Sequence, residues 1–559
     1  MIRTTARSIL LLVTAACVAL ATSPVVAGEP VAATSSGSWG PPPTTIVWTA
    51  CGEGADPAAQ CGTVAVPLDY DRPRAGSVTI GLARIAASNA NQKLGTVFVN
   101  PGGPGGSGVD FVAWYGFGSY LAELLDGRYD VVGFDPRGVG ATEPIRCFES
   151  NDAAAEFLGS QPVFPFEQGQ YRPFYQAWFD YGKRCGGSDQ PIVTNMSTAD
   201  VARDLDELRR AVGDRGLNYL GFSYGSYIGN TYAKLFSQNV GRMVIDGVLD
   251  PQLWSSGWQI TSDRIATQEV LDEFLRLCDE AGADCAFHTA EGAASRWDRL
   301  AKSLRAQPVD LGDGFLFGYD LLVAVTTSAL YAPEVWAGTD GFAARLDMLA
   351  DLALGEGAVN PAASAASYRA LLERLGGPSA DLAAEPYLFN GLDAYYGNHC
   401  ADAEYPRAFA PWRATDRYAA AGSRFGPLWW WSNAGCAAWP VNRDRYAGPW
   451  STGTANPVLV VGNRFDPSTA YSGAQASSRY LNGSRLLTYA GWGHTAFGRS
   501  ECVTQAVVDY LIGGSLPEPG TECPANPNPF LPSDVRSAGM PAPLVGLPPA
   551  WTLVVAAGR

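Results

Sequence analysis

The feature that most constrains this chain is a serine held between two glycines, in residues 218–233, which read NYLGFSYGSYIGNTYA. An apolar run that suits a buried strand precedes Ser223, and the residues after it have apolar side chains at helical spacing. So tight a turn needs small residues two positions either side of the serine, where Gly221 and Gly225 stand. The pattern predicts an exposed hydroxyl at a helix N-terminus, although a pentapeptide alone can also arise by chance.

Strand and helix signals alternate on both sides of this turn. The expected strands are residues 62–68, 77–85, 95–100, 130–134, 217–222, 241–246, 457–461 and 485–489, and the expected helices are 198–212, 224–236 and 503–512. The first two strands form an antiparallel hairpin, and the stretch containing Cys147 and Cys185 is expected to be rich in loops. Such alternation is typical of an α/β domain with a mostly parallel sheet.

The alternation stops near residue 250 and resumes after 451, which predicts a large helical cap inserted into the α/β domain. The insertion contains Trp429, Trp430 and Trp431, which are either a core cluster or a wall of a substrate pocket. We therefore expect residues 46–250 and 452–530 to form one core, interrupted by a cap at 251–451.

The N-terminus has the pattern of a secretory signal peptide, residues 1–27, with two arginines, a short apolar run and small residues. A cut after Ala21 is an alternative, and Cys17 is a poor site for lipid attachment because the apolar run continues past it. Residues 28–45 are expected to be a flexible leader, and 531–559 a loose proline-rich tail. The chain is expected to be secreted.

The formal net charge of −16 predicts a protein that repels nucleic acid and anionic lipid. Ten of the eleven cysteines follow the signal peptide, and an even number in an oxidising compartment implies disulfides. Loop closure favours neighbours in sequence, so the expected pairs are Cys51 with Cys61, Cys147 with Cys185, Cys278 with Cys285, Cys400 with Cys436, and Cys502 with Cys523. We expect no metal site, because there is no C-x-x-C and the three histidines are scattered.

Three residues that could form a catalytic triad, Ser223, Asp466 and His494, occur in this order, and each follows a predicted strand. Loops at the carboxyl ends of parallel strands meet at one sheet edge, and this order is the one that α/β-hydrolases use. Serine needs a base to take its proton, and a carboxylate can orient the imidazole. The other histidines, His288 and His399, fall in the helical insertion and are expected to be structural or at the surface, with contact to the pocket as an alternative for His399.

The chain resembles secreted actinobacterial peptidases of the prolyl-aminopeptidase and tripeptidyl-aminopeptidase group within the α/β-hydrolases. The motifs that carry the resemblance are NPGGPGGSG, GFDPRGVGATEP, GFSYGS, VIDGVLDP, GNRFDPST and GWGHT. The resemblance implies an oxyanion hole built from the backbone amides of Gly103, or Gly102, and Tyr224. Asn100 and Pro101 replace the histidine seen in many prolyl aminopeptidases, which favours the tripeptidyl branch.

The leading hypothesis is a monomeric serine exopeptidase that releases short peptides, tripeptides among them, from free N-termini without a cofactor. An exopeptidase must bind an α-ammonium, and the candidate acids are Asp402 and Glu404, with Asp246 as an alternative. An esterase or lipase with the same triad is the runner-up, and a catalytically dead binding protein is a third possibility. No stable association with membranes is expected.

Overall fold

The computed structural model describes residues 45–311, 315–356, 387–440, 442 and 444–532. The predicted signal peptide, nearly all of the flexible leader and most of the proline-rich tail lie outside the described residues, as do residues 357–386 of the insertion.

A ten-stranded sheet forms the centre of the α/β part, and two short strand pairs lie apart from it. The ten strands are β1 (Thr49–Ala50), β2 (Ala59–Pro67), β3 (Ser77–Ile85), β4 (Gly95–Asn100), β5 (Tyr129–Phe134), β6 (Leu217–Phe222), β7 (Val240–Asp246), β11 (Val458–Phe465), β13 (Arg485–Trp492) and β14 (Glu522–Cys523). The short pairs are β8 (Val309–Asp310) with β9 (Leu316–Phe317), and β10 (Thr452–Gly453) with β12 (Leu481–Asn482).

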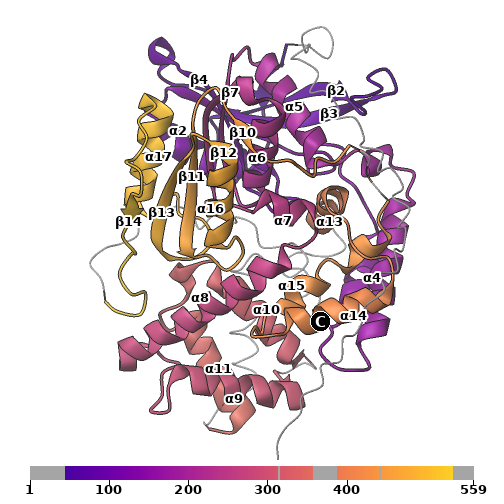
Figure 1. Ribbon diagram of the computed structural model, residues 1–559, viewed down its shortest axis with the longest axis vertical. Coiled ribbons are helices and arrows are strands. Elements are labelled where there is room, and N and C mark those ends of the chain that lie inside the picture. The colour runs from indigo at the N-terminus through magenta and orange to yellow at the C-terminus, as the bar shows by residue number, and fades with distance from the viewer. Residues whose placement is uncertain (1–44, 312–314, 357–386, 441, 443, 533–559) are drawn as a thin grey trace, which may run out of the picture. The chain divides into compact units, whose positions relative to one another are not determined.

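Helices flank the sheet and fill most of the insertion (Figure 1). Before β11 they are α1 (Gly108–Ala113), α2 (Phe117–Leu124), α3 (Asn151–Gly159), α4 (Tyr171–Gly186), α5 (Thr198–Ala211), α6 (Tyr224–Leu235), α7 (Pro251–Ser255), α8 (Ile260–Ala281), α9 (Ala293–Ala306), α10 (Tyr319–Leu330), α11 (Phe342–Leu354), α13 (Asn390–Asp402), α14 (Phe409–Ala419) and α15 (Gly426–Trp431). After β11 come α16 (Tyr471–Tyr480) and α17 (Glu501–Gly513).

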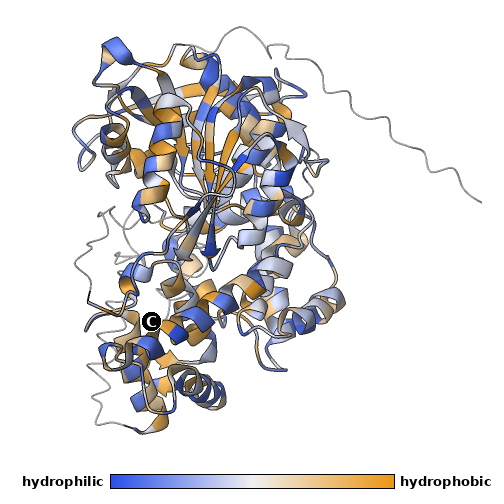
Figure 2. Cartoon of the chain, turned by 60° about the vertical axis from the view of Figure 1, so that its left-hand side comes forward, coloured by the Kyte–Doolittle hydropathy of each residue, from blue (hydrophilic) through white to orange (hydrophobic). Residues whose placement is uncertain are grey.

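The sheet is mostly parallel, with the strand order β1-β2-β3-β5-β4-β6-β7-β11-β13-β14. The first three strands pair antiparallel, and all neighbours from β5 to β14 pair parallel. The central strands β4, β5 and β6 are buried along nearly their whole length, and strands in the middle of the sheet are orange in Figure 2. Continuous apolar runs are expected where helices cover both faces of a parallel sheet. The predicted α/β-hydrolase architecture is confirmed.

The expected loop-rich stretch around Cys147 and Cys185 is wrong, because the structure has helices α3 and α4 there. Helix α4 buries Phe174, Trp178 and Tyr181, which recur at helical spacing although aromatic residues have only modest helix propensity. Its partners lie in the insertion: Trp178 packs on Tyr396, with ring centroids 5.2 Å apart, and Phe174 packs edge to face on Trp431. Tertiary packing therefore stabilises α4, and helices from two separate chain segments pack together.

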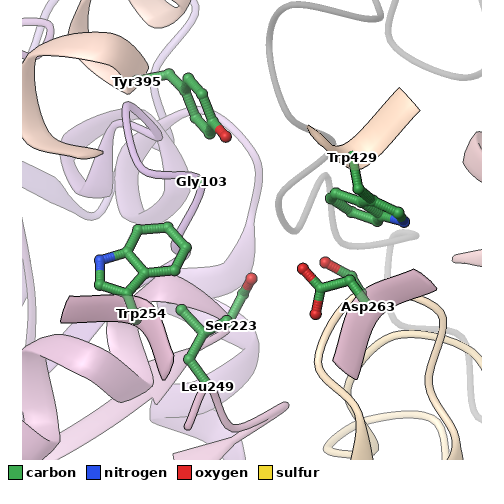
Figure 3. A pocket seen from close by; sticks show the side chains of 8 residues that line it. Gly103, Ser223, Leu249, Trp254, Asp263, Tyr395 and Trp429 are labelled. Atoms are coloured by element: carbon green, nitrogen blue, oxygen red, sulfur yellow. The ribbon is translucent and has the colours of Figure 1, made fainter. Parts of the chain in front are cut away.

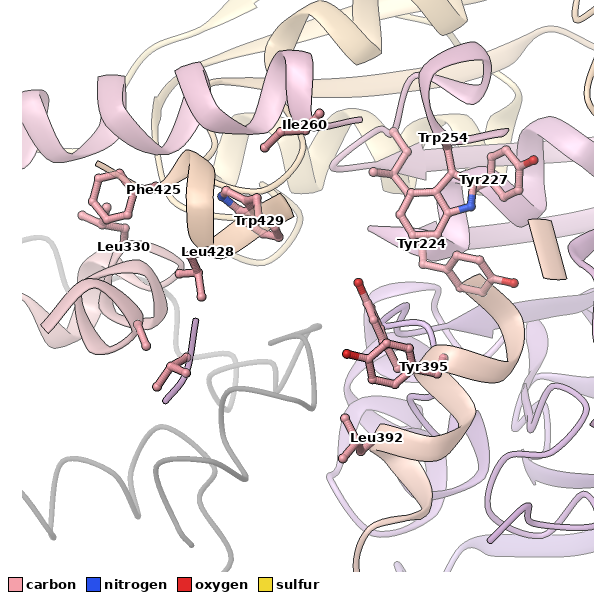
Figure 4. Packing of buried hydrophobic residues seen from close by; sticks show 14 of the residues in the cluster. Tyr224, Tyr227, Trp254, Ile260, Leu330, Leu392, Tyr395, Phe425, Leu428 and Trp429 are labelled. Carbon is pink, nitrogen blue, oxygen red and sulfur yellow. The ribbon is translucent and has the colours of Figure 1, made fainter. Parts of the chain in front are cut away.

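The buried core continues from the sheet into the helical insertion. Figure 4 shows Tyr224 and Tyr227 of α6 beside Trp254 of α7, and Tyr395 of α13 facing Trp429 of α15 across a gap. The rings of Tyr224 and Tyr227 each lie 5.8 Å from that of Trp254. Aromatic contacts of this kind add to the free energy of burial, so the insertion is anchored directly on the helix that follows Ser223.

All five predicted disulfides are present: Cys51–Cys61, Cys147–Cys185, Cys278–Cys285, Cys400–Cys436 and Cys502–Cys523. Two of them brace the helical part, since Cys400 lies in α13 and Cys278 in α8. Among the described residues, no helix combines the length and apolar character that crossing a membrane requires.

Candidate active site

Ser223 stands on the sharp turn that its flanking glycines predicted. It has φ 56° and ψ −121°, a backbone conformation that is strained for any residue with a side chain, and α6 begins at the next residue. A Cβ on Gly221 would come within 2.5 Å of the Gly225 carbonyl oxygen, so the turn closes only with glycine at that position. The backbone N–H of Ser223 donates to the carbonyl of Asp246, 2.9 Å away, which ties the turn to β7.

The structure brings Asp466 and His494 together. Nδ1 of His494 lies 3.0 Å from each carboxylate oxygen of Asp466, and both side chains are almost fully buried. The carboxylate also accepts hydrogen bonds from Thr469, through its backbone N–H at 2.8 Å and its hydroxyl at 2.8 Å. This leaves Nε2 of His494 as the nitrogen free to take a proton, since it is buried without a hydrogen-bond partner in the described chain.

The pKa values of two buried acids beside His494 are shifted in opposite directions. Burial raises the pKa of Asp246 to about 6, against hydrogen bonds from the backbone N–H groups of Phe497 and Ala496. Burial also opposes ionisation of Asp466, but attraction to His494 and the hydrogen bonds it accepts prevail and lower its pKa. Asp466 therefore stays ionised and can orient the ring, whereas Asp246 fixes the backbone after His494.

The glycine-rich loop after β4 lies directly against the serine turn. Gly102 has φ +95°, and a Cβ there would come within 2.5 Å of the Phe222 carbonyl oxygen and 2.8 Å of the Ser223 Cβ. Its N–H donates to the side chain of Asn100 at 3.0 Å. Gly103, also at positive φ, lines the pocket above Ser223.

The far end of this loop is held by a buried acid. Asp135 accepts the hydroxyl of Ser107 at 2.7 Å and the backbone N–H groups of Val109 and Ala141 at 3.0 and 2.7 Å. Burial raises the pKa of Asp135 to about 6 in spite of these donors. The DPRGVG motif thus fixes the loop that approaches Ser223.

A pocket opens above Ser223, and its walls come from both the α/β part and the insertion (Figure 3). It is lined by Gly103, Ser223, Leu249, Trp254, Asp263, Tyr395, Trp429 and Ser468. In Figure 3, Trp254, Leu249 and Tyr395 lie on the side of Ser223, and Asp263 and Trp429 lie across from them. The walls are mainly aromatic, and Asp263 contributes the only carboxylate among these lining residues.

The two acids of the insertion that the sequence suggested as amine ligands do not line this pocket. Asp402 is buried and accepts hydrogen bonds from Thr198, at 2.7 Å from its N–H and 2.6 Å from its hydroxyl, and from Trp254 at 3.4 Å. Glu404 is exposed and forms an ion pair with Arg445. Asp402 therefore supports a pocket wall from behind, and the alternative, Asp246, is engaged beside His494.

Each of the three tryptophans has a separate place. Trp429 lines the pocket, while the indole N–H groups of Trp430 and Trp431 donate to the Trp412 carbonyl and to Asp416 in the core. Their separate positions could not be predicted from the sequence, because neighbouring residues on a short helix point in different directions.

The two remaining histidines are structural, as expected. His288 pairs with Asp279 at 2.8 Å near the surface. His399 is buried behind the pocket, stacked on Tyr395, and burial lowers its pKa to about 3, so it is neutral.

Sequence reasoning missed Asp263 and Thr469. Asp263 lies in the first turn of α8, where an acid is common because it complements the helix dipole. Thr469 follows Asp466 by three residues, and a hydroxyl there is also typical of an ordinary turn. Only the folded structure shows that these two residues belong to the site.

Comparison with known proteins agrees with this geometry. Residues 183–275, around Ser223, match the α/β-hydrolase fold family, and residues 421–523, which contain Asp466 and His494, match the TAP-like protein family. The chain is 31% identical to the tripeptidyl aminopeptidase of Streptomyces coelicolor over 84% of both chains. It is 30% identical to the serine protease Hip1 of Mycobacterium tuberculosis, over 86% of this chain and 91% of the other.

A third relative is named for a different activity. The carboxylesterase B of Mycobacterium tuberculosis is 31% identical, over 83% of this chain and 86% of the relative. The chain therefore belongs to the TAP-like α/β-hydrolases, the family of the tripeptidyl aminopeptidases, and is a serine hydrolase.

Proposed function

We propose that this chain is a secreted serine exopeptidase that releases short peptides, tripeptides among them, from free N-termini. The observation that carries the proposal is the pocket above Ser223, walled on one side by Asp263 and Trp429 of the insertion. An open cleft lets a long chain pass in both directions, whereas a pocket walled by a cap favours a chain end. Similarity to the Streptomyces tripeptidyl aminopeptidase supports the same activity.

In this mechanism Ser223 is the nucleophile. Its Oγ attacks the scissile carbonyl while Nε2 of His494 accepts the hydroxyl proton, which His494 then gives to the leaving amine. Asp466 keeps the ring oriented through Nδ1 and stabilises the imidazolium. Water, activated by the same histidine, hydrolyses the acyl-enzyme and frees Ser223 for another turnover.

The negative charge that develops on the carbonyl oxygen would be held by two backbone N–H groups, those of Gly103 and Tyr224. Tyr224 is the first residue of α6, and such a residue has no acceptor for its N–H within the helix. Gly103 is preferred to Gly102, because the Gly102 N–H already donates to Asn100.

Export to the cell exterior is part of the proposal. It rests on the signal-peptide pattern of residues 1–27 and on five disulfides, which are typical of oxidising compartments. We further propose that the enzyme acts as a monomer, without a cofactor, and that residues 251–451 form its cap. Peptides or protein N-termini would be its substrates.

A second candidate, an esterase with the same triad, is favoured by the similarity to the mycobacterial carboxylesterase B. The chemistry of acyl transfer is the same for an ester and an amide, so the triad cannot separate the two. The difference lies in how the rest of the substrate is bound.

A matched substrate panel tests the proposal. It consists of a tripeptide p-nitroanilide with a free amine, the same peptide acetylated, a single-residue anilide and a short-chain nitrophenyl ester. The exopeptidase predicts the highest kcat/KM for the free tripeptide among the anilides. Equal cleavage of the free and acetylated tripeptides would point to an endopeptidase, and turnover of the ester alone would point to the esterase.

A further inference from the structure

Asp263 is a buried carboxylate in the pocket wall with no cation beside it in the described part of the chain. The whole residue is 5% exposed, and it lies in the first turn of α8. Figure 3 shows its carboxylate across the pocket from Ser223, facing the space between them. No arginine or lysine of the described residues forms an ion pair with it.

Only one oxygen of this carboxylate is engaged. Oδ1 accepts hydrogen bonds from the side chains of Gln259 at 2.7 Å and Ser262 at 3.3 Å, both at the start of the same helix. Oδ2 accepts none from the described residues. Asp246 and Asp402 are buried to a similar degree, but both oxygens of each accept hydrogen bonds. Asp263 can therefore accept further hydrogen bonds through Oδ2, and the residue lies in the pocket wall.

Burying a carboxylate without a partner is unfavourable, because the charge loses its hydration and gains no pairing in return. Burial raises the pKa of Asp263 well above its usual value, the two hydrogen bonds oppose this, and the charge of Asp466 adds repulsion. A cation that enters the pocket would pair with the Asp263 carboxylate and offset its repulsion by Asp466. A residue kept in this state is therefore suited to bind a positively charged ligand group.

The walls around this space also suit a cation. Trp254, Trp429 and Tyr395 line the same pocket, and aromatic faces attract an ammonium group. The reacting carbonyl must lie at Ser223, so a cation bound at Asp263 would belong to the same substrate molecule.

We propose that Asp263 binds the α-ammonium of the substrate's N-terminal residue and thereby selects peptides with a free amine. The inference rests on the exopeptidase function proposed above. It transfers the amine-binding role from Asp402 and Glu404 to an acid that faces Ser223.

The test compares two substrates that differ only in charge. One is Ala-Ala-Ala-p-nitroanilide, and the other carries an isobutyryl group in place of its first alanine, so that a methyl replaces the ammonium. The wild-type enzyme is expected to prefer the free amine by about 100-fold in kcat/KM, which is about 2.8 kcal/mol at 1.4 kcal/mol per tenfold.

In Asp263→Asn this preference should fall to about onefold to threefold, through loss of activity on the free amine alone, because the lost charge contacts only the ammonium. Glu404→Gln removes an exposed acid of the same insertion and should keep the wild-type ratio. A preference that survives in Asp263→Asn would overturn the role of Asp263 and leave the exopeptidase proposal standing. A wild-type enzyme with no preference would overturn the exopeptidase proposal itself.

Two further measurements distinguish the loss of amine binding from a general loss of activity in Asp263→Asn. The first is Asp263→Glu, which keeps the charge and should restore part of the amine preference. The second is thermal unfolding at pH 8, where removing an unpaired buried charge should leave the midpoint unchanged or higher. A lower midpoint together with no rescue by glutamate would mean that Asp263 is structural.

A last substrate separates the α-ammonium from a cationic side chain. A capped peptide with lysine next to the scissile bond should be a poor substrate for the wild-type enzyme. Cleavage of this peptide that depends on Asp263 would overturn the assignment to the N-terminal amine.

Discussion

The carbonyl oxygen of Tyr331 accepts a hydrogen bond from the backbone N–H of His494, 2.9 Å away, and the two rings meet edge to face with centroids 4.9 Å apart. Tyr331 follows α10 of the insertion, whereas His494 follows β13 of the sheet. The insertion therefore helps to hold the His494 loop as well as to wall the pocket. The same segment thus covers the pocket and contacts the proposed base, His494.

Tyr331→Ala should lower kcat/KM for the tripeptide anilide by about tenfold to 100-fold, because small displacements of a catalytic group are costly. The reason is that the ring of His494 loses its neighbour while the backbone hydrogen bond remains possible. Tyr331→Phe keeps the ring and should stay within about threefold of the wild type. Steady-state kinetics of the two variants check this, and equal activities would contradict a positioning role for the ring.

Ser223→Ala and His494→Ala should each leave less than about one part in a thousand of the wild-type turnover. The physical reason is that one removes the nucleophile and the other removes the base whose Nε2 has no other partner in the described chain. A fluorophosphonate should label Ser223 of the wild type and nothing in Ser223→Ala. Thermal unfolding serves as the control for folding, and a well-folded variant that keeps more activity would rule out this triad.

The strands and the candidate triad were predictable because they follow from local rules. Buried parallel strands appear as short apolar runs, so β4 (Gly95–Asn100) begins and ends where the pattern indicates. The order Ser223, Asp466, His494 needs only the rule that strand ends share one edge of the sheet. The disulfides followed from the preference for close neighbours in sequence.

The pocket could not be predicted, since it depends on which segments pack together. Helix α4 lies before Ser223 in the chain yet packs with the insertion, and no local signal indicates this. Asp402 and Asp263 are both helical acids of the insertion, but one accepts three hydrogen bonds and the other faces Ser223. The number of hydrogen bonds that a carboxylate accepts is a property of the folded chain.

Gly102→Ala should lower activity by about 100-fold or more, because the new Cβ would meet the carbonyl of Phe222 at 2.5 Å and displace the loop. Gly116→Ala is the matched control: Gly116 also has positive φ, but nothing lies within 4 Å of its Cβ. Both substitutions should lower the free energy of unfolding by about 1–2 kcal/mol, because alanine is strained at positive φ. Only the first should affect kcat/KM, so a similar loss in both variants would assign the effect to strain.

Several buried acids should make the free energy of unfolding fall as the pH rises. Burial raises the pKa of Asp393 to about 7, in spite of hydrogen bonds from Tyr387, Tyr181 and the Cys147 N–H, and raises that of Asp402 to about 7. In the unfolded chain these groups titrate near 3.9. Between about pH 4 and 7 the folded state therefore binds more protons, so stability is lost as the pH rises across this range, and the loss levels off above about 7.

The free energy of unfolding, measured by denaturant titration, should accordingly still fall between about pH 6.5 and 7.5 and then level off. This window avoids His399, whose lowered pKa acts only below its unfolded value of about 6.5. Asp393→Asn removes one titrating group and should flatten the decline, whereas Asp279→Asn changes a partly exposed acid and should leave it unchanged. The two phenolic hydroxyls that donate to Asp393 can still donate to the asparagine oxygen or reorient, so the variant should fold. An equal decline in Asp393→Asn and in the wild type would mean that Asp393 does not contribute to it.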